Sequence, residues 1–223
     1  MHGSSNEADP PLSQATLDGA GLADPAPVTD YRVRPATAAD ADAICRIYNQ
    51  GIEDRVATLE TELRTPEERR RWLANRSPRH PVVVAEATEP RFVGGHGGGE
   101  TEPGRTFVKP PTESSGLAAP ATMVGWGSLN VFNPREAYRF VADFSIYVER
   151  AWRGRGVGRA MLEALIELAR THGFHKLVLS AFPFNAVGGA LYEKLGFRTV
   201  GVYREQGLLD GKWVDTIIME KLL

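Results

Sequence analysis

The chain has 223 residues, with 26 basic and 28 acidic side chains and a formal net charge of −2. This balance argues against nucleic acid as a partner bound through bulk charge. A single cysteine, Cys45, excludes an internal disulfide and a multi-cysteine zinc site, and no apolar run approaches the roughly 20 residues that span a bilayer. No Lys or Arg precedes Arg32, so the charged start of a secretory signal is missing, and we expect a cytoplasmic protein without a membrane partner.

Two segments have compositions that argue against a packed core. Residues 1–29 contain four prolines, four acids and neither Lys nor Arg, which predicts a disordered tail. Residues from about 88 to 121 are rich in glycine and proline, which predicts a surface insertion in a hairpin connection. The remainder predicts one domain over residues 30–223 that carries this insertion.

The first half of the domain predicts two helices between strands. A short strand is expected over 31–35, and Thr37 with Asp40 forms a capping box for a helix that ends at Gly51. A second helix begins at Thr65-Pro66 and runs to about Asn75. The β-branched run over 81–87 is typical of a buried strand. Cys45 on the first helix is interpreted as a small apolar filler rather than a nucleophile.

The second half alternates between β-type and helical periodicity. We predict strands over 123–131, 138–148, 177–181, 199–204 and 213–221, and helices over 156–172 and 186–195. Gly196 closes the last helix, and Asp210-Gly211 joins the last two strands. The order of elements predicts mixed strand pairing with helices on both faces of the sheet.

The sharpest chemical signal is the glycine-rich turn between the strand ending at Val148 and the following helix. Free N–H groups at a helix N-terminus form an anion site suited to a pyrophosphate, and glycines let phosphates approach the backbone. The alternating glycines lack the third glycine of a dinucleotide fingerprint, and the Gly-Lys-Ser/Thr of a P-loop is absent. Arg153, Arg155 and Arg159 add positive charge here.

Arg153-x-x-Gly156-x-Gly158 after a strand resembles the R/Q-x-x-G-x-G/A motif of the GNAT superfamily of acyl-CoA N-acyltransferases. Asn185 and the stretch Leu191–Phe197 fall into register with the same family. The resemblance implies an α/β protein of α+β type. Its GNAT fold has a central mixed, mostly antiparallel twisted sheet, with a splay between two parallel strands, here 138–148 and 177–181.

The resemblance also implies acetyl-CoA as co-substrate, with no metal. Its pantetheine arm would lie in the splay along Ile146, Tyr147 and Val148, and Asn185 would bond the arm. The remaining residues carried over hold the pyrophosphate: Arg153, Gly154, Arg155, Gly156, Val157, Gly158 and Arg159.

The stretches Ile47–Ile52 and Thr58–Glu60, together with Arg135-x-x-Tyr138, are similar to the phosphinothricin and arsinothricin N-acetyltransferases. That similarity implies a homodimer and resistance through acetylation of the α-amine of small glutamate-like amino acids, including methionine sulfoximine.

Three residues are candidate substrate contacts by this similarity. Arg135 holds an anionic group or is a solvated loop arginine, Tyr138 accompanies it, and Glu60 meets the amine or caps a turn. Leu209 and Val214 stand where similar enzymes carry Lys and His, so the substrate's anionic group stays open.

The chemistry requires a base, because an amino acid's α-amine is mostly protonated near neutral pH. Asp143, on the strand that binds acetyl-CoA, is the candidate general base, or else a carboxylate satisfied by backbone amides or Arg139. Tyr192 is the candidate general acid for the CoA thiolate, or else an aromatic core residue. Two alternative functions stay open: a protein N-terminal or polyamine acetyltransferase, and a non-catalytic acyl-CoA sensor.

Overall fold

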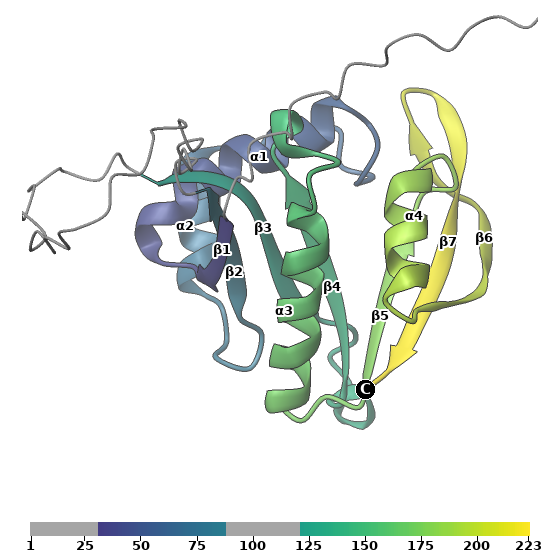
Figure 1. Ribbon diagram of the computed structural model, residues 1–223. Helices are drawn as coiled ribbons and strands as arrows, with labels where there is room; N and C mark the ends of the chain where they lie inside the picture. Colours follow the sequence, from purple (N-terminus) through teal and green to yellow (C-terminus); the bar gives the residue numbers. More distant parts are fainter. Residues whose placement is uncertain (1–30, 88–120) are drawn as a thin grey trace, which may run out of the picture.

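A computed structural model describes residues 31–87 and 121–223 (Figure 1). The predicted tail at 1–29 and the insertion expected from residue 88 lie outside these ranges. In the described residues the strands form one mixed sheet in the order β1-β2-β3-β4-β5-β7-β6. Their bounds are β1 Tyr31–Pro35, β2 Val82–Ala87, β3 Thr122–Val131, β4 Val141–Val148, β5 Lys176–Ala181, β6 Arg198–Leu209 and β7 Lys212–Leu222.

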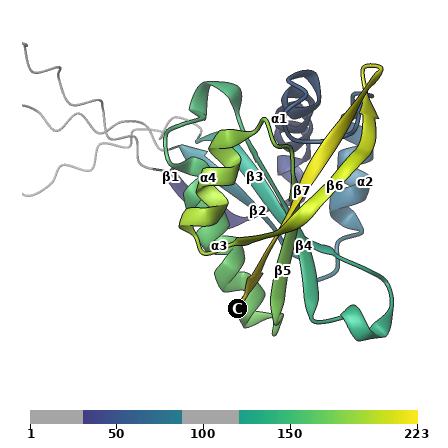
Figure 2. The same ribbon diagram turned by 90° about the vertical axis from the view of Figure 1, so that its right-hand side faces the viewer.

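Helices cover both faces of the sheet, as the sequence predicts (Figure 2). They are α1 Ala41–Glu53, α2 Pro66–Ala74, α3 Val157–Thr171 and α4 Ala186–Lys194. Successive strand residues point to opposite faces. Val84 therefore belongs to the cluster under α1 and α2, while Val83 belongs to the cluster under α3. None of the helices in the described ranges is long and apolar enough to cross a membrane.

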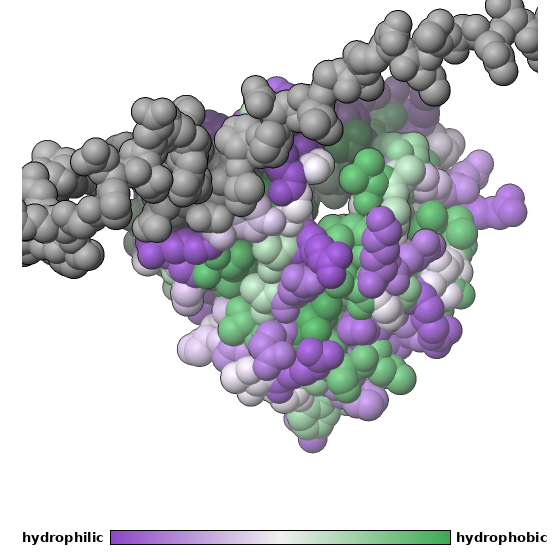
Figure 3. All heavy atoms as spheres, viewed as in Figure 1, coloured by the Kyte–Doolittle hydropathy of each residue, from purple (hydrophilic) through white to green (hydrophobic). Residues whose placement is uncertain are grey.

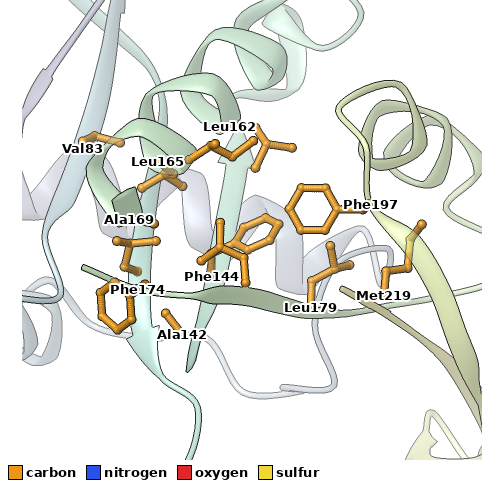
Figure 4. Packing of buried hydrophobic residues seen from close by; sticks show 13 residues of the cluster. Val83, Ala142, Phe144, Leu162, Leu165, Ala169, Phe174, Leu179, Phe197 and Met219 are labelled. Carbon is orange, nitrogen blue, oxygen red and sulfur yellow. The ribbon is translucent and has the colours of Figure 1, made fainter. Parts of the chain in front are cut away.

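The largest core cluster lies between α3, α4 and the middle of the sheet (Figure 4). Leu162 and Leu165 of α3 are fully buried in it, as expected for the apolar stripe of this helix. The rings of Phe144 in β4 and Phe197 before β6 lie 5.5 Å apart. This cluster holds the two halves of the sheet together on either side of β4.

The halves meet at the only parallel strand pair among the described residues. β4 pairs with β5 over Val141–Asp143 and Lys176–Val178, and beyond these residues the strands diverge. This confirms the predicted parallel pair and its splay. The predicted start of the strand at Tyr138 is wrong, because residues 136–138 form a 3₁₀ turn. Asn133 Oδ1 accepts the Arg135 N–H at 3.0 Å and starts that turn.

The predicted end of the first helix at Gly51 is also wrong. α1 continues to Glu53, and Gly51 is buried within it. A Cβ at this position would lie 2.9 Å from the ring of Tyr147 in β4. That ring stacks on Trp126 with centroids 4.9 Å apart, so it has little room to move. Glycine is therefore required for the close approach of α1 to β4.

Gly51→Ala is expected to lower the free energy of unfolding by about 1–2 kcal/mol, because overpacking against an anchored ring outweighs the gain in helix propensity. Gly189→Ala in α4 is the matched control, since a Cβ there meets nothing within 4 Å. It should raise stability by about 0.5–1 kcal/mol. Denaturant unfolding of both variants measures the difference, and equal stabilities would contradict the packing argument.

Candidate active site

A cleft opens where β4 and β5 diverge. Among the described strands, β4 pairs from Phe144 onward with β3 on one side only, so the backbone groups on its other edge have no strand partner there. The walls come from β4, β5, β7, the start of α4 and the segment after α1, with lining residues that include Val56–Leu59, Asp143–Tyr147, Leu179–Phe182, Asn185, Tyr192 and Thr216. Apolar side chains show between the polar outer faces of α3 and α4 on this side of the molecule (Figure 3). The arrangement suits an extended, mostly apolar arm laid along β4.

Asp143 lies at the closed end of the splay and lines the cleft. Burial raises the pKa of its carboxyl to about 6, although a hydrogen bond with the Phe144 backbone opposes this rise. Arg139 does not neutralise it, since that guanidinium pairs with Glu136 at 3.1 Å and lies over the Phe140 ring. A carboxylate whose pKa lies just below neutral can accept a proton from a bound ammonium group.

Tyr192 reaches the same cleft from α4. Its ring packs edge-on against Phe144, with centroids 5.9 Å apart, and also against Phe197. Burial, and next the charge of Asp143, raise the pKa of the Tyr192 hydroxyl. The hydroxyl therefore stays protonated near neutral pH and is available as a donor. The structure thus brings both predicted catalytic residues into one cavity.

The glycine-rich turn leads from β4 into α3 as predicted. Gly154 has φ +76° and Gly156, the N-cap of α3, has φ +86°, a region that favours glycine. No side chain of the described residues caps the helix, so the first N–H groups of α3 are available to an anion.

The arginines of the turn are not equivalent. The Arg153 guanidinium forms an ion pair of 2.6 Å with the carboxylate of Asp54, the residue that follows α1. Arg159 forms an ion pair with Glu163 of its own helix. Arg155 lies over the Trp152 ring at 5.2 Å. Arg153 would have to leave Asp54, or share it, to contact a phosphate.

Two residues that the sequence did not single out attach α1 to this turn. The Gln50 amide donates to Glu149 at 3.1 Å and accepts the Arg150 N–H at 2.9 Å. Asp54 accepts hydrogen bonds from Arg150 and pairs with Arg153, and these contacts hold the pKa of Asp54 below its ordinary value. No local pattern could have revealed these roles, because the partners lie about one hundred positions away in the sequence.

Both side-chain amide atoms of Asn185, the residue predicted to bond the pantetheine arm, form hydrogen bonds within the chain. Its Oδ1 caps α4 by accepting the Gly188 N–H at 3.1 Å, and its Nδ2 donates to the Val56 carbonyl at 3.2 Å. It therefore ties α4 to the segment Val56–Leu59 across the cleft. Arg55 reinforces this link by holding Asp210, in the β6–β7 turn, through two hydrogen bonds of 2.9 and 3.1 Å.

The remaining predicted residues divide between the cleft and its surroundings. Ile146 and Tyr147 line the cleft, and Val148 lies at the end of β4, next to the turn. Glu60 lies outside the lining and pairs with Arg64 at 2.7 Å. Burial alone would raise the pKa of Glu60, but hydrogen bonds from Arg64 and Tyr48 outweigh it and lower the value.

Arg135 and Tyr138 do not line the cleft between β4 and β5. They line a second hollow near the start of β4, together with Arg79 and His80. The Tyr138 ring packs there against Phe132, with centroids 5.6 Å apart. Substrate contact by Arg135 therefore stays a prediction that the geometry of one chain does not explain.

Cys45 is buried, and its thiol lies 3.1 Å from the Arg64 carbonyl. Burial raises the pKa of this thiol, which makes it a poor nucleophile, and it does not line the cleft. Over the described ranges, no group of three His, Cys, Asp or Glu residues could hold a metal ion.

Comparison with known proteins agrees with this geometry. The family model for the acetyltransferase (GNAT) family matches residues 52–197. A Bacillus subtilis protein provisionally named as a phosphinothricin acetyltransferase is 30% identical over 86% of this chain and 98% of its own length. The L-methionine sulfoximine/L-methionine sulfone acetyltransferase of Pseudomonas aeruginosa is 26% identical over 84% of this chain and 92% of its own.

Solved structures of N-acetyltransferases have a similar fold. A phosphinothricin acetyltransferase from Sinorhizobium meliloti in complex with acetyl-CoA superposes with a TM-score of 0.68, at 26% identity, over 86% of this chain and 88% of its own. A ribosomal-protein-alanine N-acetyltransferase from Brucella melitensis, 30% identical, also gives 0.68, over 86% and 99% of the two chains.

Proposed function

The chain belongs to the GNAT family of N-acetyltransferases, which use acetyl-CoA, and we propose that it acetylates the α-amine of a small toxic amino acid of the phosphinothricin, arsinothricin or methionine sulfoximine type, and so confers resistance. The observation that carries the proposal is that a half-buried carboxylate, Asp143, and the half-buried hydroxyl of Tyr192 line the same cleft where β4 and β5 diverge.

The residues present fit acetyl-CoA, which supplies the acetyl group. The unpaired edge of β4 over Ile146–Val148 offers backbone donors and acceptors to the amides of its arm. The uncapped start of α3, with Gly154–Arg159 and Arg153, offers N–H groups and charge to its phosphates. Asn185 keeps the walls of the cleft together in this proposal, and its amide would bond the arm of acetyl-CoA from the start of α4.

Each catalytic group has one proton to move. Asp143 takes a proton from the substrate's ammonium group, directly or through one water, so that the nitrogen lone pair becomes free to attack the thioester carbonyl. Tyr192 gives its proton to the thiolate that leaves when the carbon–sulfur bond breaks. The backbone N–H near Ser145 or Ile146 donates to the acetyl oxygen. Transfer is direct, since no suitable thiol lines the cleft in the described residues.

The cleft favours a small amine over the alternative substrates. The segment 55–59 contacts α4 through the Val56 carbonyl and the β6–β7 hairpin through Arg55, which narrows the opening that a peptide N-terminus would need. Asp143 is the one charged residue in the described lining, whereas a polyamine calls for an acidic wall. A homodimer is part of the proposal, because β6 is an edge strand exposed on both faces with Val200, Val202 and Tyr203 in contact with solvent.

A thiol-release assay with acetyl-CoA tests the proposal. The amines are phosphinothricin, arsinothricin, methionine sulfoximine, methionine sulfone, glutamate, spermidine and a peptide N-terminus. Turnover of the toxic amino acids is expected. Turnover of spermidine or the peptide alone would reject the substrate class, and no turnover, with acetyl-CoA still raising Tm, would favour an acyl-CoA sensor.

Gly156→Ala is expected to raise the Kd for acetyl-CoA about tenfold, because a Cβ at φ +86° costs about 1–2 kcal/mol and the turn would relax away from its anion-binding geometry. The new Cβ would also lie 2.7 Å from the Tyr31 hydroxyl. Gly158→Ala is the matched control, since its Cβ would make ordinary contacts of 3.5 Å with Leu191 and 3.6 Å with Val148. Calorimetric titration should show unchanged affinity for the control, and a similar loss in both variants would contradict the role of Gly156.

A further inference from the structure

The cleft has little positive charge to offer a substrate. Among its described lining residues Asp143 alone is charged. Arg55 adjoins the lining segment, but Asp210 already holds it through two hydrogen bonds. Arg135 lies in the second hollow. An anionic side-chain group bound in the cleft would therefore face the Asp143 carboxylate without a counter-ion from the part of the chain that the structure describes.

Thr216 supplies a neutral hydrogen-bonding group instead. It lies on β7, is 3% exposed, lines the cleft, and its buried Oγ1 has no hydrogen-bond partner within the described ranges. A buried hydroxyl without a partner is destabilising, and valine would fill the same volume without that cost. The hydroxyl is therefore suited to a ligand group that enters the cleft.

Two other polar side chains of the cleft, Ser145 and Asn185, are already engaged. Ser145 Oγ accepts from the Asn130 amide at 3.1 Å, and the Asn185 amide bonds Val56 and Gly188. The hydroxyl of Thr216 thus differs from these neighbours in being free to bond a ligand.

Strand register places Thr216 on the same side of the sheet as the candidate base. Asp143 is opposite Val178 in β5, and Ser180 is opposite Ile218 in β7. Because side chains alternate along a strand, Asp143, Ser180 and Thr216 all lie on the α1 side of the sheet. A substrate whose amine approaches Asp143 can therefore direct the far end of its side chain along this face toward Thr216.

We propose that the amino-acid substrate carries an uncharged hydrogen-bonding side-chain group, such as a sulfone or sulfoximine, and that the Thr216 hydroxyl donates to it and selects it over a phosphinate or carboxylate. The inference rests on the proposed function and narrows its substrate class. The α-amine and α-carboxylate are common to all these amino acids, so the preference comes from the side-chain group alone.

Steady-state kinetics on methionine sulfone, phosphinothricin and methionine test this, with methionine as the analogue that lacks the acceptor oxygens. The wild-type chain should give at least about tenfold higher kcat/KM for the sulfone than for phosphinothricin. Thr216→Val should lower kcat/KM for the sulfone about five- to tenfold, the worth of one neutral hydrogen bond, and leave methionine unchanged. Thr216→Ser, which keeps the hydroxyl, should retain the preference.

Three results would overturn the inference. One is an equal loss for sulfone and methionine in Thr216→Val, which would indicate a packing defect. Another is no loss in that variant. The third is a wild-type preference for phosphinothricin, above all one removed by Arg135→Ala. Turnover of these amino acids without the expected preference rejects this inference alone. No turnover of any of them, with acetyl-CoA still raising Tm, rejects the proposed function and this inference with it.

Discussion

Asp143→Asn is expected to lower kcat about 10²- to 10⁴-fold, the usual contribution of a positioned general base. The amide cannot take the ammonium proton, yet it preserves the shape of the side chain. Binding of acetyl-CoA should persist, because the anion site and the unpaired edge of β4 lie elsewhere. Measuring kcat beside the acetyl-CoA-induced rise in Tm separates the two effects. Glu167→Gln, an exposed acid on α3, is the control that should change neither.

The same residue predicts a pH dependence. Because burial raises the pKa of Asp143 to about 6, the base is protonated below that value, and kcat/KM should fall as the pH drops through 6 rather than near the ordinary 3.8. Stability should change in the opposite sense. The ionised form is disfavoured in the folded state, so this cost is absent below about pH 4 and complete above about pH 6.

Asp143→Asn should therefore unfold at a higher temperature than the wild type at pH 7, with a gain of about 1–2 kcal/mol. A variant that is less active and more stable indicates a functional carboxylate. Full activity in the variant, or an acid limb near pH 4, would reject Asp143 as the base and favour a sensor or a different proton acceptor.

Tyr192→Phe is expected to lower kcat about 10²-fold, because the leaving thiolate would lose its proton donor. The phenyl ring keeps the packing against Phe144 and Phe197, so Tm should stay unchanged. Burial raises the pKa of Tyr192, and therefore the wild type should show no alkaline loss of activity near neutral pH from this group. Rapid-quench kinetics would show whether the chemical step is the one affected.

The matched control is Tyr203→Phe, which removes an exposed hydroxyl from β6, away from the cleft. It should leave kcat unchanged. If Tyr192→Phe also keeps full kcat, Tyr192 is an aromatic core residue, and water or solvent supplies the proton.

Features that depend on residues adjacent in the sequence were predictable from the sequence. The second helix starts at Thr65-Pro66 as expected, Gly196 ends α4 with φ +83°, and Asp210-Gly211 forms the last hairpin turn. The Gly154–Arg159 turn, the strand before it and the helix after it are likewise contiguous. Backbone conformation over a few residues is set by side chains close in sequence, so these elements can be read locally.

Local reasoning failed where distant residues decide the outcome. Gly51 has the composition of a helix end, but the Tyr147 ring, 96 positions later, makes it a packing glycine inside α1. The start of β4 was misplaced because strand-like alternation continues into a 3₁₀ turn. The predicted substrate contacts Arg135 and Tyr138 line a separate hollow of this chain, and their contact with substrate stays a prediction.

The sequence alone therefore determined the fold family, the acetyl-CoA motif and the identities of the candidate base and acid, because each rests on a contiguous motif or on periodicity within one element. Only the tertiary structure decided which side chains share the cleft, and that within residues 31–87 and 121–223 no cation lines it beside Asp143 and no group bonds the Thr216 hydroxyl. Burial, pKa and hydrogen-bond satisfaction are properties of neighbours in space, and the neighbours of Asp143 and Thr216 come from strands and helices far apart in the chain.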